Sequence, residues 1–450
     1  LFRSKRQAFK SILTDDGWLD NVAVETDESG LITDINPVRT GERMIDGFAV
    51  PGFINSHSHA FQYAMAGLAE RQIAGRESDD FWSWRENMYR VALEVDPEEM
   101  RVIATMLYKE MRRRGFTSVV EFQYLHHDKD GTPYAEAATM AIALLEAAAE
   151  AGIKITLTPV MYCQGGFGRP ATERQRRFIS KNVDEYLRLV EATKDACAKY
   201  SGSRLGVGVH SLRAVNPEDL QEVVRGTPQD APFHLHASEQ IKEVEECVAT
   251  LRARPVEWLL SNLELSSRFS LVHATHMVES ETLGLAQSGA VAVLCPSTEA
   301  SLGDGVFPLR KYISAGGRWS IGTDSHIGID PVEELRLLDS FQRLETHRRD
   351  TFPGDPGRFA ILESARGGAL SDGSLNTGLR IGGALDACVF KASTPLVSEL
   401  RSADLASTLI LASGAAEVMG TFVGGNYKTA EPPSSESVAE FSRAVQKFRS

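Results

Sequence analysis

Histidine and acidic side chains occur at four places in this 450-residue chain, each directly after a short apolar run. In chain order they are His57 and His59, His236 and Glu239, His273, and Asp324. An isolated His-X-His pair is weak evidence, because buried histidines often serve packing alone. Residues two apart in an extended chain face the same side, so His57 and His59 can direct both imidazoles at one point. Imidazole and carboxylate groups are ligands that zinc takes in proteins, so the four places together predict a metal or catalytic centre.

Eight strand-like runs alternate with helix-like segments and have to bring these residues together. Several runs are almost continuously apolar or small, as strands covered by helices on both faces should be. The pattern predicts an α/β fold, a (β/α)8 TIM-like barrel, in which active sites lie at the carboxyl ends of the strands. The runs are residues 53–56, 117–122, 154–162, 204–209, 232–237, 269–274, 290–294 and 318–323.

An open doubly wound sheet is the alternative fold for such an alternation. It would ordinarily carry a glycine-rich phosphate-binding turn after its first strand. Here the first strand runs into His-Ser-His instead, which favours the closed barrel.

Both ends of the chain differ from this repeating unit. Residues 21–25 and 31–35 read as strands around a turn, and the runs 387–391 and 421–423 look similar. We therefore expect residues 1–51 and 371–450 to build one small β-rich domain. It would stand beside a barrel formed by residues 52–370. The tail at 431–437 reads as a loop or linker.

The composition argues against several classes of partner. Lys and Arg number 48 against 61 Asp and Glu, a net charge of −13, and we find no local basic patch for nucleic acid. No uncharged run approaches the roughly 18 residues of a membrane span, and no apolar stretch of signal-peptide length follows the basic start. The five cysteines are scattered without a CxxC pair, which fits reduced thiols. We expect a cytoplasmic protein without a nucleic-acid or membrane partner, and further a homodimer.

Polar side chains near the same strand ends indicate the charge of the substrate. Arg85 lies in an aromatic segment, Tyr124 follows the second predicted strand, and Arg213 follows the fourth. Arginine presents a planar fork suited to carboxylates, and it stays charged in any pocket. The set predicts a small anionic substrate, with a structural salt bridge as the alternative role for Arg213.

The motifs PGFINSHSH, HLHASE, VHATH and GTDSH resemble those of the amidohydrolase superfamily, specifically its mononuclear zinc deaminase branch, over roughly residues 50 to 330. The resemblance implies that Glu239 shuttles protons and that His273 lies beside the reacting water. His236 is preferred to His234 as a ligand because it lies nearer the strand end. Binuclear members carry a carboxylated lysine at the end of strand four, where this chain has none. One Zn²⁺ per chain is thus implied, held by His57, His59, His236 and Asp324.

Longer blocks, including FWSWRENMYR, EFQYLHHD, HSLRAV and STEASLGDGVFP, resemble the family of formimidoylglutamate deiminases. That resemblance implies hydrolysis of N-formimidoyl-L-glutamate to N-formyl-L-glutamate and ammonia in histidine degradation. It also implies which residues hold the carboxylates and the formimino group of the substrate. These are Gln62, Arg85, Tyr124, His210 and Arg213.

Two other functions stay open at this point. A related zinc deaminase acting on a nucleobase or nucleoside, such as guanine or an adenosine derivative, would share the metal centre but has less use for Arg85 and Arg213. A catalytically silent barrel used as an assembly module would ordinarily have lost ligand residues, whereas this chain retains all of them.

Overall fold

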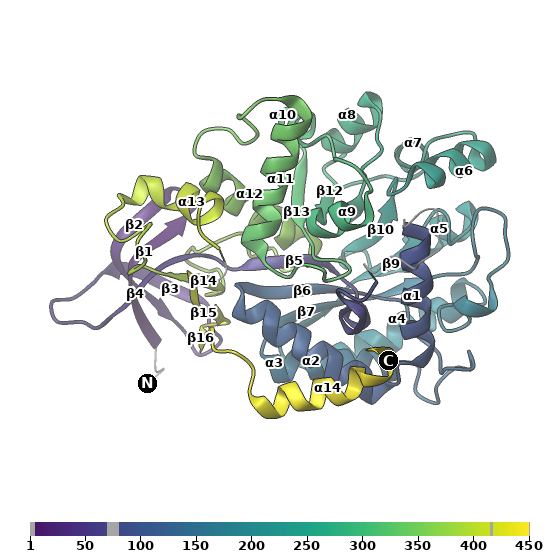
Figure 1. Ribbon diagram of the computed structural model, residues 1–450, viewed down its shortest axis with the longest axis horizontal. Coiled ribbons are helices and arrows are strands. Elements are labelled where there is room, and N and C mark those ends of the chain that lie inside the picture. Colours follow the sequence, from purple (N-terminus) through teal and green to yellow (C-terminus); the bar gives the residue numbers. More distant parts are fainter. Residues whose placement is uncertain (1–4, 70–80, 415–416, 450) are drawn as a thin grey trace.

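The computed structural model describes residues 5–69, 81–414 and 417–449, with residues 81–83 as backbone only (Figure 1). Parallel strands form a nearly closed barrel in the order β5-β6-β7-β9-β10-β11-β12-β13. A parallel bridge between Ser58 and Asp324 links the ends of the first and last strands. The predicted α/β fold with a TIM-like barrel is confirmed. Its strands are β5 (Phe53–Ser58), β6 (Phe116–Gln123), β7 (Lys154–Met161), β9 (Val207–Ser211), β10 (Phe233–Ala237), β11 (Phe269–His273), β12 (Val291–Leu294) and β13 (Arg318–Ile321).

The fourth predicted strand is divided into two pieces. A short strand, β8 (Ser203–Leu205), pairs with β7, and β9 then pairs with both β7 and β10. Gly206 lies at the break, where an added Cβ would come within 2.2 Å of the Thr158 hydroxyl oxygen. The chain therefore passes too close to β7 at this point for a larger residue. Because β9 runs on to Ser211, His210 lies inside the strand, one residue before its end.

Helices cover the outside of the barrel, and several start with the capping chemistry that their sequences carry (Figure 1). The Asp96 carboxylate accepts a hydrogen bond from the Glu99 backbone N–H at 2.9 Å, and the Glu99 carboxylate accepts one from the Asp96 N–H at 3.0 Å. Asn216 and Asp330 cap their helices in a similar way. Between barrel strands lie α1 (Phe81–Glu94), α2 (Pro97–Arg113), α3 (Thr139–Ala151), α4 (Val183–Cys197), α5 (Pro217–Gly226), α6 (Ile241–Leu251), α7 (Pro255–Asn262), α8 (Glu279–Ser288), α9 (Pro296–Leu302) and α10 (Leu309–Ser314), with α11 (Pro331–Thr346) and α12 (Pro356–Ser371) after the last strand.

A second sheet at one end of the molecule contains strands from both ends of the chain, as predicted (Figure 1). Its order is β16-β15-β14-β4-β1-β2-β3, and most of its neighbours are antiparallel. A small core that includes Phe9, Val24, Val389 and Phe422 fills one face. Its strands are β1 (Lys5–Thr14), β2 (Gly17–Thr26), β3 (Ile32–Pro37), β4 (Met44–Pro51), β14 (Ala387–Lys391), β15 (Val418–Val423) and β16 (Asn426–Thr429), and α13 (Ser402–Leu411) follows β14.

The C-terminal tail ends in a helix, α14 (Ser435–Arg449), so the expected loop at 431–437 is wrong from Ser435 onward. The helix lies along α2, as the yellow segment of Figure 1 shows, and it also contacts the short 3-10 helix η1 (Ala60–Met65). The Phe441 ring packs 5.4 Å from the ring of Tyr63 in η1, and Phe448 is buried. The end of the chain thus supports the segment that directly follows the His-Ser-His motif.

A search of the described residues finds no helix whose length and apolar character would suit it to cross a membrane.

Candidate metal centre and active site

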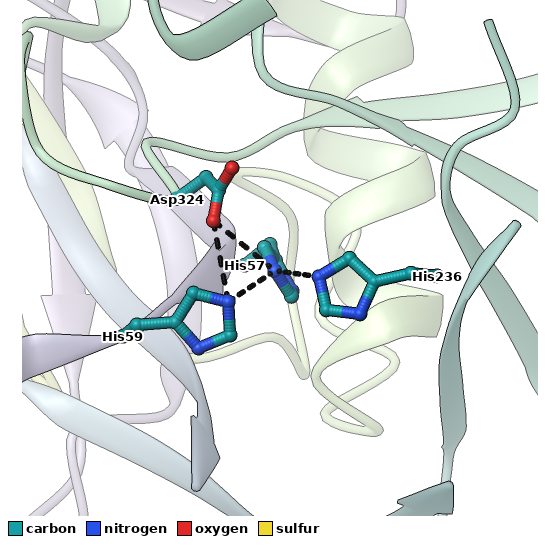
Figure 2. Close-up of side chains that lie close together, drawn as sticks. All are labelled: His57, His59, His236 and Asp324. Carbon is teal, nitrogen blue, oxygen red and sulfur yellow. Dashed lines mark hydrogen bonds and ion pairs between the residues drawn. The ribbon is translucent and has the colours of Figure 1, made fainter. Parts of the chain in front are cut away.

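Four ligand-type atoms from three strand ends converge at the mouth of the barrel (Figure 2). The Nε2 atom of His57 lies 3.1 Å from that of His59 and 3.0 Å from that of His236. Asp324 Oδ1 lies 3.5 Å from His57 Nε2 and 3.2 Å from His59 Nε2. Ligands at about 2.0–2.1 Å from a tetrahedral ion lie roughly 3.3 Å from one another. The spacing therefore matches the ligand shell of one small cation.

Backbone carbonyls determine which nitrogen two of these rings present. The Nδ1 atoms of His59 and His236 lie 2.9 Å and 3.0 Å from the carbonyl oxygens of Phe122 and His210. A carbonyl can only accept, so both rings carry the proton on Nδ1 and direct the Nε2 lone pair at the centre. Lone pairs this close together repel unless a cation lies between them. The donor set of three imidazoles and one carboxylate fits zinc.

The surroundings of His57, His236 and Asp324 favour the protonation states that a metal requires. Burial lowers the pKa of His57 to about 3, with a further contribution from the neighbouring His59. Burial also lowers the pKa of His236 well below its usual value. For Asp324, burial would raise the pKa, but the close contacts of its carboxylate with His57 and His59 outweigh burial and hold that pKa well below its ordinary value. Neutral imidazoles and an ionised carboxylate result.

A buried polar network fixes the backbone beneath the ligands. The Asn55 amide oxygen accepts from the Thr323 N–H at 3.0 Å, and its NH₂ group donates to the Thr323 hydroxyl at 2.7 Å, which joins β5 to the end of β13. Glu121 accepts from the Ser58 hydroxyl and the Ala60 N–H, each at 2.6 Å. These contacts hold the His-Ser-His segment on both sides.

Left-handed backbone conformations gather at the strand ends of the site. Ser238, His273 and Asp324 have φ angles of +52°, +66° and +46°. Residues with side chains rarely adopt such angles, and the surrounding structure must stabilise them. They turn the chain sharply where β10, β11 and β13 deliver their polar side chains.

Glu239 and His273 lie beside the ligand cluster. The Nε2 atom of His273 is 3.8 Å from Glu239 Oε1 and 3.8 Å from Asp324 Oδ2. Burial raises the pKa of Glu239, and the charges of His273 and Arg213 oppose that shift. Burial lowers the pKa of His273, but Glu239, Glu299 and Asp324 together raise it to about 10. A carboxyl that holds a proton readily therefore faces an imidazole that donates hydrogen bonds. Cys295 also lies close, with its sulfur within 4.8 Å of ligand atoms of His273 and Asp324.

Two buried glutamates that the sequence did not single out hold these side chains. Glu299 Oε1 lies 3.2 Å from Nδ1 of His273, on the far side of that ring from Glu239. Glu243 accepts from the backbone N–H groups of Ser238 at 3.3 Å and Glu239 at 3.1 Å. Both glutamates lie within helices, where a glutamate ordinarily indicates a solvated face. Both lie in the first turn of a helix that directly follows a barrel strand, and this position is the signal that would have identified them.

A narrow cavity of about 50 Å³ opens beside the cluster, and all five predicted substrate-binding residues line it. Gln62 donates to the Tyr124 hydroxyl at 3.0 Å, and the Arg85 guanidinium lies 5.7 Å from the centre of the Tyr89 ring.

Two further cavity residues, Arg213 and His210, have shifted pKa values. Arg213 is 5% exposed, and burial lowers its pKa, but the charges of Glu243 and Glu239 outweigh burial and raise it. The His210 ring stacks on the His236 ring at 4.8 Å, and burial lowers its pKa well below normal. Trp84, from the aromatic segment that contains Arg85, also lines the cavity, and the wall residues missed from the sequence are Met88, Tyr89, Tyr162, Phe178 and Leu302.

Other histidines lie outside the cluster. His234 Nε2 lies 2.8 Å from the Ser371 carbonyl, deeper in the barrel. His326 contacts the Thr323 hydroxyl at 2.9 Å, behind the ligands. His126 and His127 each contact a backbone carbonyl, of Val160 and Ile179.

Known proteins resemble this chain in sequence and in fold. The model of the amidohydrolase family matches residues 48–370. The chain is 42% identical over 422 residues to formimidoylglutamate deiminase of Pseudomonas aeruginosa, which covers 92% of each protein. It is 26% identical over 406 residues to 5-methylthioadenosine/S-adenosylhomocysteine deaminase of Natronomonas pharaonis, covering 88% of this chain and 86% of that protein. The crystal structure of an amidohydrolase from Brucella melitensis has a TM-score of 0.93 at 39% identity, covering 99% of this chain and 100% of that chain.

Proposed function

The chain belongs to the amidohydrolase family, and we propose that it hydrolyses N-formimidoyl-L-glutamate to N-formyl-L-glutamate and ammonia, with one zinc ion per chain. The observation that carries the proposal is that a metal-ligand cluster and a cavity with two arginines lie side by side. Three imidazoles and a carboxylate converge at one point, and the adjoining cavity is lined by two arginines. The first feature suits hydrolytic chemistry and the second suits a dicarboxylate substrate.

His57, His59, His236 and Asp324 would hold the ion, and a bound Zn²⁺ would supply a water molecule whose pKa is lowered towards about 7. The same nitrogen and oxygen ligands can also accept iron, manganese or nickel. Zinc is therefore the part of the proposal that metal analysis tests directly.

Side chains around the centre account for the proton transfers. Asp324 is ionised and can accept a proton from the attacking water. Glu239 gives a proton to the terminal nitrogen of the formimidoyl group as the water oxygen adds to its carbon. The amino group then takes the second proton, which Asp324 received from the water, while the hydroxyl proton of the adduct returns to Glu239. The bond between the carbon and the terminal nitrogen breaks, the formyl C=O forms, and ammonia leaves. His273 stabilises the charge that develops at the reacting centre by hydrogen bonding.

The cavity supplies the charge complementarity for the rest of the substrate. Arg85 and Arg213 would bind the two carboxylates, and Gln62, Tyr124 and His210 would orient the chain between them. The net charge of −13 repels a dianion at long range, so attraction has to arise inside this pocket. A cytoplasmic location and a homodimer stay predictions.

Zinc-dependent deamination of a nucleobase or nucleoside is the second candidate, favoured by the likeness to a 5-methylthioadenosine/S-adenosylhomocysteine deaminase. The two arginines in the cavity argue against it, because a neutral purine gives a guanidinium no carboxylate to bind. A silent assembly module would have no need for a complete ligand set.

An ammonia-release assay separates these functions. Purified protein with measured zinc content is incubated with N-formimidoyl-L-glutamate, N-formimidoyl-L-aspartate or guanine. We expect ammonia and N-formyl-L-glutamate in equal amounts from the first compound. No ammonia from it, despite stoichiometric zinc, contradicts the proposal, and release from guanine alone supports the second candidate. A protein that binds no zinc supports the silent module.

A further inference from the structure

The first turn of α9 contacts three different parts of the barrel mouth through three consecutive residues. Ser297 donates to the Glu334 carboxylate in α11 through its backbone N–H at 2.9 Å and its hydroxyl at 2.5 Å. The Thr298 hydroxyl donates to the Thr323 carbonyl at 3.1 Å and accepts from the Ser325 N–H at 3.2 Å. The residue that follows is Glu299, which turns inward to His273. The two residues directly before the glutamate thus hold this short helix to α11 and to the segment that follows β13.

Glu299 makes two contacts with a single carboxylate oxygen. Its Oε1 accepts from the Cys295 backbone N–H at 2.9 Å and lies 3.2 Å from Nδ1 of His273. The side chain is 3% exposed, and His273 is fully buried. The carboxylate can only accept here, so the His273 proton on Nδ1 is directed at it. The opposite ring nitrogen then faces Glu239 and Asp324 at 3.8 Å each.

The backbone at His273 is strained, so contacts with neighbouring residues have to stabilise the orientation of its ring. Its φ angle of +66° lies in the left-handed region, and that of the following Ala274 is +49°. Such strained turns persist only where surrounding contacts over-determine them. Among the described contacts, the Glu299 carboxylate is the one that holds Nδ1 of the ring.

We propose that Glu299 is a positioning residue, which orients the His273 ring toward the reacting centre from the first turn of α9 without touching the substrate. The inference rests on the proposed function, since it assigns His273 a part in the deimination. A carboxylate that fixes the tautomer and direction of an active-site imidazole is a recurrent device in hydrolases.

Replacement by glutamine separates positioning by the charged group from a purely structural role. The amide oxygen of Glu299→Gln can still accept from the Cys295 N–H, so the helix cap is retained. The negative charge beside His273 is lost. A structural role predicts wild-type kinetics for this variant, whereas the positioning role predicts a kcat defect with an unchanged KM.

The experiment compares wild-type holoenzyme with Glu299→Gln and Glu299→Ala. Glu281→Gln is the matched control, because Glu281 is also a buried helix-start glutamate that accepts backbone N–H groups, but it pairs with Arg254 away from the cavity. We expect Glu299→Gln to lower kcat about 10-fold to 100-fold, with KM within about twofold and zinc content unchanged. Glu281→Gln should keep the wild-type kcat. A kcat for Glu299→Gln within about twofold of wild type overturns the inference.

A spectroscopic measurement does not depend on the substrate. Proton NMR of protein with ¹⁵N-labelled histidine should show a strongly downfield Nδ1–H signal, assigned to His273 by its absence in His273→Asn. We expect the signal to shift upfield in Glu299→Gln and to disappear in Glu299→Ala, because the charged acceptor is lost. An unchanged signal in both variants overturns the inference. A wild-type protein that shows the signal but releases no ammonia from formimidoyl-glutamate overturns the proposed function alone.

Discussion

Strand β10 carries two buried histidines, His234 and His236, on the same face and in successive layers of the barrel. The lower ring, His234, lies with Nε2 2.8 Å from the Ser371 carbonyl, so its proton is on Nε2. The upper ring, His236, lies with Nδ1 3.0 Å from the His210 carbonyl and presents an unprotonated Nε2 to the cluster. Two rings on one strand are thus held in opposite tautomers. The position of one carbonyl decides whether a histidine is a structural donor or a metal ligand.

The largest expected effect comes from removing the upper ring. In His236→Ala one of four ligands is lost, so zinc content should fall well below one per chain and turnover should fall to background. Metal analysis and the ammonia assay on the same sample measure both. Retention of one tightly bound zinc with normal turnover would show that the two layers have been assigned the wrong way round.

Glu239→Gln should separate ligation from proton transfer within the upper layer. The residue lies beside the cluster and contributes none of its four ligand atoms, so zinc should stay bound. Loss of the proton donor should lower kcat about 100-fold to 10,000-fold. The measurement is kcat at saturating substrate together with zinc content. Loss of the metal in this variant would contradict the assigned role.

Two arginines, one in the cavity and one away from it, should differ in their effect on substrate binding. The expected effect is smaller than the two above. Arg213→Ala removes a buried cation from the cavity and should raise KM for formimidoyl-glutamate about 10-fold to 100-fold, because a charged hydrogen bond contributes about 1.5–3 kcal/mol. Arg268 is the control, since it donates to the carbonyls of Ala231, Val224 and Pro228 away from the cavity. Arg268→Ala should lower thermal stability and leave KM unchanged. Equal KM values for both variants would remove Arg213 from the substrate site.

The smallest expected effect is on the lower ring. His234→Gln replaces the rigid ring N–H that faces the Ser371 carbonyl with a flexible amide donor, and it should lower the free energy of unfolding by about 0.5–1.5 kcal/mol. Zinc content and kcat should stay at the wild-type level. Denaturant unfolding of the holoenzyme measures the first quantity. A zinc-free His234→Gln protein would mean that the lower layer also supports the ligands.

Sequence alone predicted the barrel and its cluster because both leave local signals. A buried parallel strand is a nearly continuous apolar run, and a polar side chain where the run ends has to lie at the mouth. His57, His59, His236 and Asp324 all have this signal, and the structure brings them together. The amidohydrolase resemblance then pointed to zinc.

Other features depend on contacts between distant segments, and sequence gave weaker signals for them. Strand β1 carries Lys5, Arg6 and Lys10, whose charges obscure its apolar alternation until β2 and β4 pair with it. Helix α14 has its buried residues at Val445 and Phe448, three apart, and its other described side chains are partly or fully exposed. The role of Glu299 exists only because α9 folds back over the end of β11. Such contacts require the three-dimensional arrangement.

The most direct test of the account is a zinc titration of the metal-free protein, followed by ammonia release from N-formimidoyl-L-glutamate. With the four-ligand centre as the reacting site, the rate should rise in proportion to added zinc and reach a plateau at one equivalent per chain. His236→Ala should show no such rise over the same range. Full turnover by the metal-free protein, or a plateau at two equivalents, would contradict a single zinc centre built from His57, His59, His236 and Asp324.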